Sequence, residues 1–157
     1  MNTKVAVVSV AVLALGFANS SAAQEQVGIR AGVSDDPDQF VFGGHIETSP
    51  LLDRLVFRPN AEIGLGNDLV LIALNLEFAY KIPLEGNPWT AYVGAGPALN
   101  ILSFGDNDGR GRGRDGTDVE GGLNILLGVE HDEGLFTEFK IGAGDSPDLK
   151  FLVGYSF

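Results

Sequence analysis

Large apolar side chains occupy every second position in eight stretches of the chain, and glycine or polar residues occupy most of the positions between them. A period of two is typical of a β-strand whose two faces meet different surroundings. Short runs rich in Gly, Pro, Asp, Asn and Ser separate the stretches and are typical of turns. The pattern therefore predicts an all-β chain of eight consecutive strands. Their approximate ranges are 26–33, 39–47, 55–64, 69–80, 89–103, 118–130, 135–142 and 149–157.

The last stretch, 149–157, keeps this alternation up to the final residue. A soluble domain rarely ends on such a strand, because chain termini usually fray. A transmembrane β-barrel does so, because its last strand pairs with its first and closes the sheet. An ordinary half-buried terminal strand is the alternative. The apolar positions that favour the barrel are Phe151, Val153, Tyr155 and Phe157.

The first 23 residues have the pattern of a secretory signal peptide. A lysine precedes an apolar run over residues 5–17, which is too short to cross a membrane as a helix. Small residues precede Gln24 in the positions that a signal peptidase reads, so we expect cleavage there. An uncleaved anchor helix is the alternative. We therefore expect a signal peptide over 1–23 and, over 24–157, a single barrel domain with no further periplasmic domain.

The chain has a formal net charge of −11 and contains no cysteine. Proteins that bind nucleic acid are usually basic, so this charge argues against a nucleic-acid partner. Without cysteine, the exported domain is held together without disulfide bonds. Beyond the first 23 residues no stretch is long and apolar enough for a transmembrane helix, so any membrane insertion must use strands. Metal-ligand spacing, a phosphate loop and a dinucleotide fingerprint are all missing, and we expect no cofactor.

The two faces of the predicted strands differ in polarity. One face is apolar in every strand, and the other carries most of the charges. A soluble ligand barrel such as a lipocalin places the apolar face inside, and the alternation alone leaves that arrangement open. The signal peptide and the width of the apolar stripes favour lipid outside. The charged candidates on the polar face are Arg30, His45, Glu47, Arg58, Glu62, Glu77, Glu120, Glu138, Lys140 and Lys150.

In an eight-stranded barrel, side chains just fill the interior. Charges buried there must pair, because an unpaired buried charge costs on the order of several kcal/mol. We therefore expect basic side chains to neutralise acidic ones, and we predict a plugged, ion-paired lumen in place of an open pore. The basic side chains are Arg30, Arg58, Lys140 and Lys150.

Two prolines, Pro59 and Pro97, fall inside predicted strands. Proline has no N–H to donate to a neighbouring strand, and a closed barrel has no free edge that would tolerate the loss. We expect each proline to mark a β-bulge or a strand end near a rim.

The longest predicted connection, 105–117, combines acidic and basic residues. Asp106 begins a fragment that looks like part of a calcium loop, but its fifth position is Arg110, which cannot ligate a cation. A solvated loop without a metal is the favoured interpretation. The arginines of this loop are candidates to contact lipopolysaccharide phosphates, and pairing with the flanking aspartates is the favoured alternative. These arginines are Arg110, Arg112 and Arg114.

The chain has two histidines, and neither lies in a recognisable catalytic pattern. Barrel enzymes that modify lipids use a histidine together with a serine or an aspartate. A constellation built on His45 would need Ser49 or a serine remote in sequence. We expect His45 to be hydrogen-bonded inside the lumen and His131 to lie in a turn.

Taken together, these features resemble the small eight-stranded outer-membrane barrels, the group of the OmpA transmembrane domain and OmpX. The signal peptide, the eight alternating stretches and the terminal residues 153–157 carry the resemblance. It implies a closed antiparallel up-and-down barrel in the outer membrane of a Gram-negative bacterium. It also implies contact with outer-membrane lipid and lipopolysaccharide, and recognition of the last strand by the barrel-assembly machinery.

The resemblance indicates an architecture and leaves the activity open. A structural or surface-interaction protein without catalysis is the favoured interpretation. A narrow porin-like channel and a lipid-modifying barrel enzyme are the alternatives within the membrane, and a soluble periplasmic ligand barrel is the alternative outside it. No surface ligand is indicated by the sequence.

Overall fold

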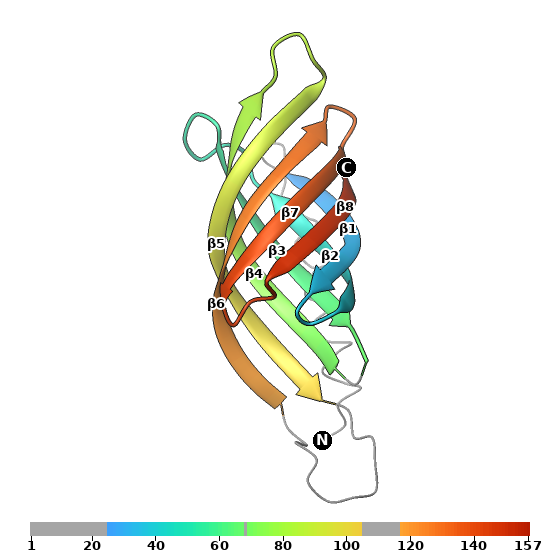
Figure 1. Ribbon diagram of the computed structural model, residues 1–157. Coiled ribbons are helices and arrows are strands. Elements are labelled where there is room, and N and C mark those ends of the chain that lie inside the picture. The colour runs from blue at the N-terminus through green and yellow to red at the C-terminus, as the bar shows by residue number, and fades with distance from the viewer. Residues whose placement is uncertain (1–24, 68, 105–116) are drawn as a thin grey trace, which may run out of the picture.

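A computed structural model describes residues 25–67, 69–104 and 117–157 of the chain. Eight strands follow one another and close into an antiparallel barrel (Figure 1). This confirms the predicted eight-stranded all-β barrel, and each predicted stretch corresponds to one strand. No helix in the described ranges is long and apolar enough to span a bilayer. The strands are β1 (Gln26–Asp35), β2 (Gln39–Glu47), β3 (Leu55–Leu65), β4 (Leu69–Pro83), β5 (Trp89–Phe104), β6 (Thr117–His131), β7 (Leu135–Gly144) and β8 (Leu149–Ser156).

The barrel is closed by the first and last strands. Residues 28–35 of β1 pair with residues 149–156 of β8, and Arg30 lies opposite Gly154 in this register. Because β1 also pairs with β2 on its other side, the sheet has no free edge there. Along the paired ranges, the backbone groups of the strands are therefore satisfied within the sheet, which is what a lipid environment requires.

The barrel wall is not equally high all round. Strands β4, β5 and β6 have 15, 16 and 15 residues, whereas the other five strands have between 8 and 11. Figure 1 shows these long strands extending beyond their neighbours. We call them the tall wall and the other five strands the short wall. The mouth is the end of the barrel where β1 begins and β8 ends, marked C in Figure 1.

Side-chain exposure follows the alternation of the sequence. On β2, Phe40 is 66% exposed, whereas His45 is 3% exposed. On β6, Leu127 is 60% exposed and its neighbour Leu126 only 1%. The apolar face of the strands thus points outward and the charged face points into the lumen. This is the reverse of the arrangement that a lipocalin-type ligand barrel requires.

Neither proline marks the expected bulge or strand end, because Pro59 lies inside β3 and Pro97 inside β5. Pairing between β4 and β5 is interrupted at Pro97 and resumes in the same register. Pairing between β2 and β3 stops beside Pro59, and beyond it the Thr48 N–H still donates to the Phe57 carbonyl over 3.0 Å in the same register. Next to each proline, which has no N–H donor, the pairing with one neighbouring strand is missing, and no extra residue is inserted.

Candidate functional site: a charge network in the lumen

Ten charged side chains at inward-facing positions are joined by ion pairs into one network. Each is contributed by the face of a strand that the alternation directs inward, so the fold itself brings them together. Cations and acids are equal in number, so the network carries no net formal charge. The cations are Arg30, Arg58, Lys81, Lys140 and Lys150, and the acids are Glu47, Glu62, Glu77, Glu130 and Glu138.

Glu62 forms the first centre of the network, with three cation partners. Its carboxylate oxygens lie 2.7 Å from Lys140 Nζ and 2.8 Å from Lys150 Nζ. Arg30 Nη1 lies 3.5 Å away. The four side chains start from β3, β7, β8 and β1, are almost fully buried, and meet inside the lumen. Three cations around one carboxylate offset the cost of removing that charge from water.

Glu138 forms the second centre. Its carboxylate lies 3.0 Å from Arg30 Nη1 and 3.3 Å from Arg58 Nη1, and it accepts a 2.8 Å hydrogen bond from the Tyr92 hydroxyl. The Arg58 guanidinium lies 4.8 Å from the centre of the Tyr92 ring and 5.4 Å from that of Phe136. Arg58 therefore has both charge partners and aromatic faces, a combination that a flat guanidinium accommodates well.

A layer of amides connects a third acid, Glu77, to the network. Asn60 Nδ2 donates to Glu77 over 2.6 Å, and Asn75 Nδ2 donates to Asn60 Oδ1 over 2.7 Å. Asn124 Nδ2 donates to Asn75 Oδ1 over 2.9 Å. Lys140 Nζ lies 2.8 Å from Glu77 and supplies its cation. Hydrogen bonds in this layer satisfy polar groups that would be costly to bury alone.

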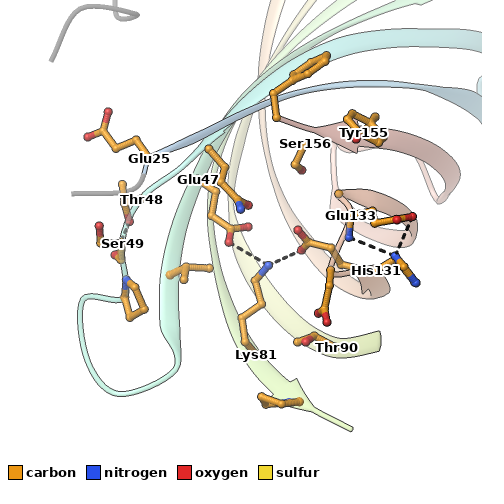
Figure 2. Close-up of a pocket in the computed structure, with 18 residues that line it drawn as sticks. Glu25, Glu47, Thr48, Ser49, Lys81, Thr90, His131, Glu133, Tyr155 and Ser156 are labelled. Carbon is orange, nitrogen blue, oxygen red and sulfur yellow. Dashed lines mark hydrogen bonds and ion pairs between the residues drawn. The ribbon is translucent and has the colours of Figure 1, made fainter. Parts of the chain in front are cut away.

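The network reaches the mouth through Lys81, which bridges two acids. Its ammonium lies 2.9 Å from Glu47 and also contacts Glu130 (Figure 2). Glu47 continues inward to Arg58, whose Nε lies 3.2 Å from Glu47 Oε2, close enough for an ion pair although not aligned as a hydrogen bond. Lys81, Glu47 and Glu130 line a cavity of about 840 Å³ at the mouth, whereas Arg58 lies deeper. Lys81 thus marks the boundary between the filled lumen and the open end.

His45 and Ser156 meet near the mouth although they are 111 residues apart in sequence. His45 Nε2 lies 3.2 Å from Ser156 Oγ, and the imidazole stands edge-on to the Phe136 ring with the ring centres 5.3 Å apart. The imidazole crosses Gly28 of β1, where a Cβ would come within 2.2 Å of His45 Cε1. A glycine is therefore required between the two partners. His45 Nδ1 has no hydrogen-bond partner among the described residues.

The turn between β7 and β8 folds inward at the opposite end of the barrel. Asn100 Nδ2 donates to the Asp145 carbonyl over 2.7 Å, and it lies 3.4 Å from Ser146 Oγ. Asn100 is fully buried, and Ser146 is only 6% exposed. This turn therefore covers part of the lumen at the end away from the mouth.

The structure buries nine of the ten charged candidates that the sequence analysis selected. Glu120 differs, because it is half-buried and has no ion pair within the part of the chain that the structure describes. It lies on the tall wall beyond Gly122, where the pairing of β6 with β7 begins, so no neighbouring strand encloses it on that side. The nine buried residues are Arg30, His45, Glu47, Arg58, Glu62, Glu77, Glu138, Lys140 and Lys150.

Lys81 was missed because the predicted strand 69–80 ended one residue before it. In the structure β4 continues to Pro83, so Lys81 shares the inward parity of Glu77 and Asn75. Extending the alternation past Tyr80 would have found it. The remote serine that His45 contacts is Ser156, which the sequence analysis did not name.

Several sequence predictions lie outside the described residues. These are the signal peptide over 1–23, the calcium-like fragment at Asp106, and the candidate phosphate contacts Arg110, Arg112 and Arg114. Within the described ranges, His, Asp and Glu side chains form no group that could hold a metal ion.

Comparison with known proteins gives structural relatives only. No protein-family model matches the chain, and no curated protein matches it. The N-terminal β-barrel domain of OprF from Pseudomonas aeruginosa superposes with a TM-score of 0.64 at 17% sequence identity, over 85% of this chain and 96% of that domain. Neisserial surface protein A superposes with a TM-score of 0.61 at 17% identity, over 85% and 96% of the two chains.

A third solved structure, the outer membrane enzyme PagL, superposes with a TM-score of 0.52 at 13% identity, over 84% of this chain and 98% of that one. At these identities the likeness shows the fold. The chain therefore has the architecture of the small eight-stranded barrels found among bacterial outer-membrane proteins. The same fold is present in an enzyme and in a protein named for its place at the surface, so the fold by itself leaves the activity open.

Proposed function

We propose that this chain is an integral outer-membrane β-barrel with a closed lumen, acting as a structural or surface-interaction protein without catalysis. The observation that carries the proposal is the inversion of polarity across the wall, with charges inside and apolar side chains outside. Ile29, Phe42, Leu127 and Ile141 are each more than half exposed, on four different strands. A monomeric soluble protein rarely exposes apolar surface on this scale, whereas a lipid bilayer covers it.

The filled lumen supports a structural role over a channel. Arg30, Glu62, Glu138 and Lys140 each have side chains no more than 1% exposed, and their ion pairs cross the barrel interior. A continuous water path would require several of these pairs to separate at once. Breaking a buried pair costs on the order of 3–5 kcal/mol, so an open state would be rarely populated.

The position of the His45–Ser156 pair supports a role without catalysis. A barrel enzyme that modifies lipids has to present its nucleophile where a lipid can reach it, whereas both of these side chains are buried inside the wall. A histidine that acts as a base is usually oriented by a third group, and among the described residues none forms a hydrogen bond with His45 Nδ1. The pair is better explained as a structural contact between β2 and β8.

The outward stripe of β8, extended by the terminal Phe157, is our candidate for recognition by the barrel-assembly machinery. Its side chains alternate regularly and are exposed by 37% to 71%. Outer-membrane lipid and lipopolysaccharide are the further partners we propose. The outward apolar side chains of the strands, such as Ile29, Phe42, Leu127 and Ile141, form an apolar belt that supports this proposal. The residues of this stripe are Phe151, Val153, Tyr155 and Phe157.

Two measurements on the purified, refolded chain test the membrane location. The folded barrel is expected to migrate differently on a detergent gel before and after heating, because the closed sheet resists unfolding by detergent. It is also expected to float with lipid vesicles after a carbonate or urea wash that removes peripheral proteins. A folded chain that stays soluble without detergent and fails to float would contradict the proposal.

A further inference from the structure

The turn between β2 and β3 exposes two leucines at the mouth of the barrel. Leu51 is 54% exposed and Leu52 is 72% exposed. The turn is held by backbone hydrogen bonds of 2.7 Å from Leu51 N–H to the Leu55 carbonyl and from Leu55 N–H to the Leu52 carbonyl. Asp53 has a φ of 46°, which turns the chain back toward β3. The backbone therefore holds both leucines in a defined, exposed position.

This turn extends away from the lumen. Thr48, Ser49 and Pro50 line the cavity at the mouth, but Leu51 and Leu52 do not. Figure 1 shows the turn reaching sideways from the barrel wall, and Figure 2 shows it leaving the rim on the side away from the cavity. The leucines therefore lie on the outer side of the barrel, the side of the apolar belt.

The leucines are also continuous with that belt. Leu52 and Leu55 form an isolated β-bridge, and Leu55 lies opposite Tyr80 of β4 in the sheet register. Tyr80 is 41% exposed on the outer surface. A tyrosine near the end of a strand is typical of the interface between hydrocarbon and headgroups, where its ring and hydroxyl meet different surroundings. Apolar surface thus continues from the strands onto the turn.

The turn lies where the wall is short. β2 has 9 residues and β3 has 11, against 15 in β4. At about 3.3 Å per residue and a tilt of about 45°, nine residues span roughly 21 Å, less than the apolar band of about 25 Å that outer-membrane barrels present. By the same arithmetic the eleven residues of β3 just reach this height, so the belt is incomplete only along β2, and the two leucines follow directly after that strand.

We infer that the β2–β3 turn is a lipid-contacting part of the barrel, with Leu51 and Leu52 inserted among the acyl chains next to the short wall. The inference rests on the proposed membrane location and adds a segment outside the strands to the lipid interface. Asp53 and Arg54 follow the leucines with opposite charges, so this part of the turn adds no net charge at the headgroups. The occupant is phospholipid, because the exposed leucines join the proposed lipid-facing surface through Leu55 and Tyr80.

Tryptophan fluorescence in vesicles tests this inference directly. The chain has a single tryptophan, Trp89, so W89F gives a background without tryptophan emission. Single tryptophans are then placed at the turn by L51W, in the belt by L127W and in the β4–β5 turn by E85W. Each variant is refolded into phosphatidylcholine vesicles with and without brominated acyl chains, and folding is checked by heat-dependent gel mobility.

We expect brominated chains to reduce the emission of L51W by a fraction close to that of L127W, while E85W keeps its emission. L52W is the second variant should L51W fold poorly. Loss of emission at L127W with none at L51W or L52W would overturn the inference and leave the membrane location intact. Loss at none of these positions in folded protein would overturn the membrane location and the inference together.

Discussion

The centre of the lumen and its mouth use the same ion-pair chemistry in different surroundings. At the centre, the Glu62 and Lys140 side chains are each 1% exposed. The central carboxylates Glu62, Glu77 and Glu138 each pair with at least one buried cation. At the mouth, the Lys81 side chain is 15% exposed and that of Glu130 is 11% exposed beside a cavity. Water can screen and solvate the mouth pairs but not the central ones. The contribution of an ion pair to the stability of the barrel therefore depends on how deeply the pair is buried.

The largest effect is expected from Lys140→Met, which removes a central cation and keeps the length of the side chain. Glu77 then loses its ammonium partner, and Glu62 keeps only the longer contact to Arg30 and the one to Lys150. An uncompensated buried carboxylate should lower the free energy of unfolding by about 3–5 kcal/mol. Urea unfolding in lipid vesicles, followed by Trp89 emission, measures this.

The matched control is the double variant K140M/E77Q. Lys140 is the cation partner that the structure gives Glu77, so removing both charges restores the balance and should recover a large part of the lost stability. If K140M alone lowers the free energy of unfolding by less than about 1 kcal/mol, the central pairs behave like solvent-exposed pairs, which contradicts the comparison.

An intermediate effect is expected from Gly28→Ala, near the boundary between the two regions. The added Cβ would lie 2.2 Å from His45 Cε1 and 2.9 Å from the Tyr155 carbonyl oxygen. Overpacking of this kind should cost about 1–3 kcal/mol of unfolding free energy. The same urea titration measures it, and Gly44→Ala serves as the control, because its Cβ would approach no atom closer than 3.4 Å.

Part of the Gly28→Ala cost should disappear in G28A/H45A, because shortening the imidazole removes the side-chain contact. If the loss of unfolding free energy in the double variant equals the sum of the losses in G28A and H45A, the His45 ring is not what Gly28 accommodates. The contact with the Tyr155 carbonyl would then be the whole cause.

The smallest effect is expected from Lys81→Met at the mouth. Its two acids are open to the cavity, and Glu47 keeps its contact to Arg58. A partly exposed pair contributes about 1 kcal/mol or less, and added salt should weaken it further. Unfolding at low and high ionic strength measures both properties. A cost for K81M equal to that of K140M would remove the distinction between the two regions.

The fold and the polarity of the lumen were predictable because the period of two is strictly local. Whether Arg58 and Glu62 share a face depends only on their spacing along one strand, which no distant contact alters. The predicted strand ended at Tyr80, whereas β4 continues to Pro83. Lys81, which bridges Glu47 and Glu130 at the mouth, was lost with that boundary.

The pairings themselves were not predictable from the alternation. Lys140 reaches Glu62 across 78 residues, and His45 reaches Ser156 across 111, because the register and tilt of the strands set their relative heights. Alternation gives the face of a residue but not its height in the barrel. For this reason Ser49, which is near in sequence, was the named candidate for the serine partner of His45. The actual partner is Ser156, which the closure of β1 against β8 brings close.

The claim that a self-neutralising network closes the lumen is tested most directly by planar-bilayer conductance of the folded protein. The account predicts a baseline current without steady steps, because Glu62, Glu138 and their cations fill the interior. Uniform ohmic steps from protein shown to be folded by its gel mobility would contradict it, since ions would then pass where the structure places these side chains.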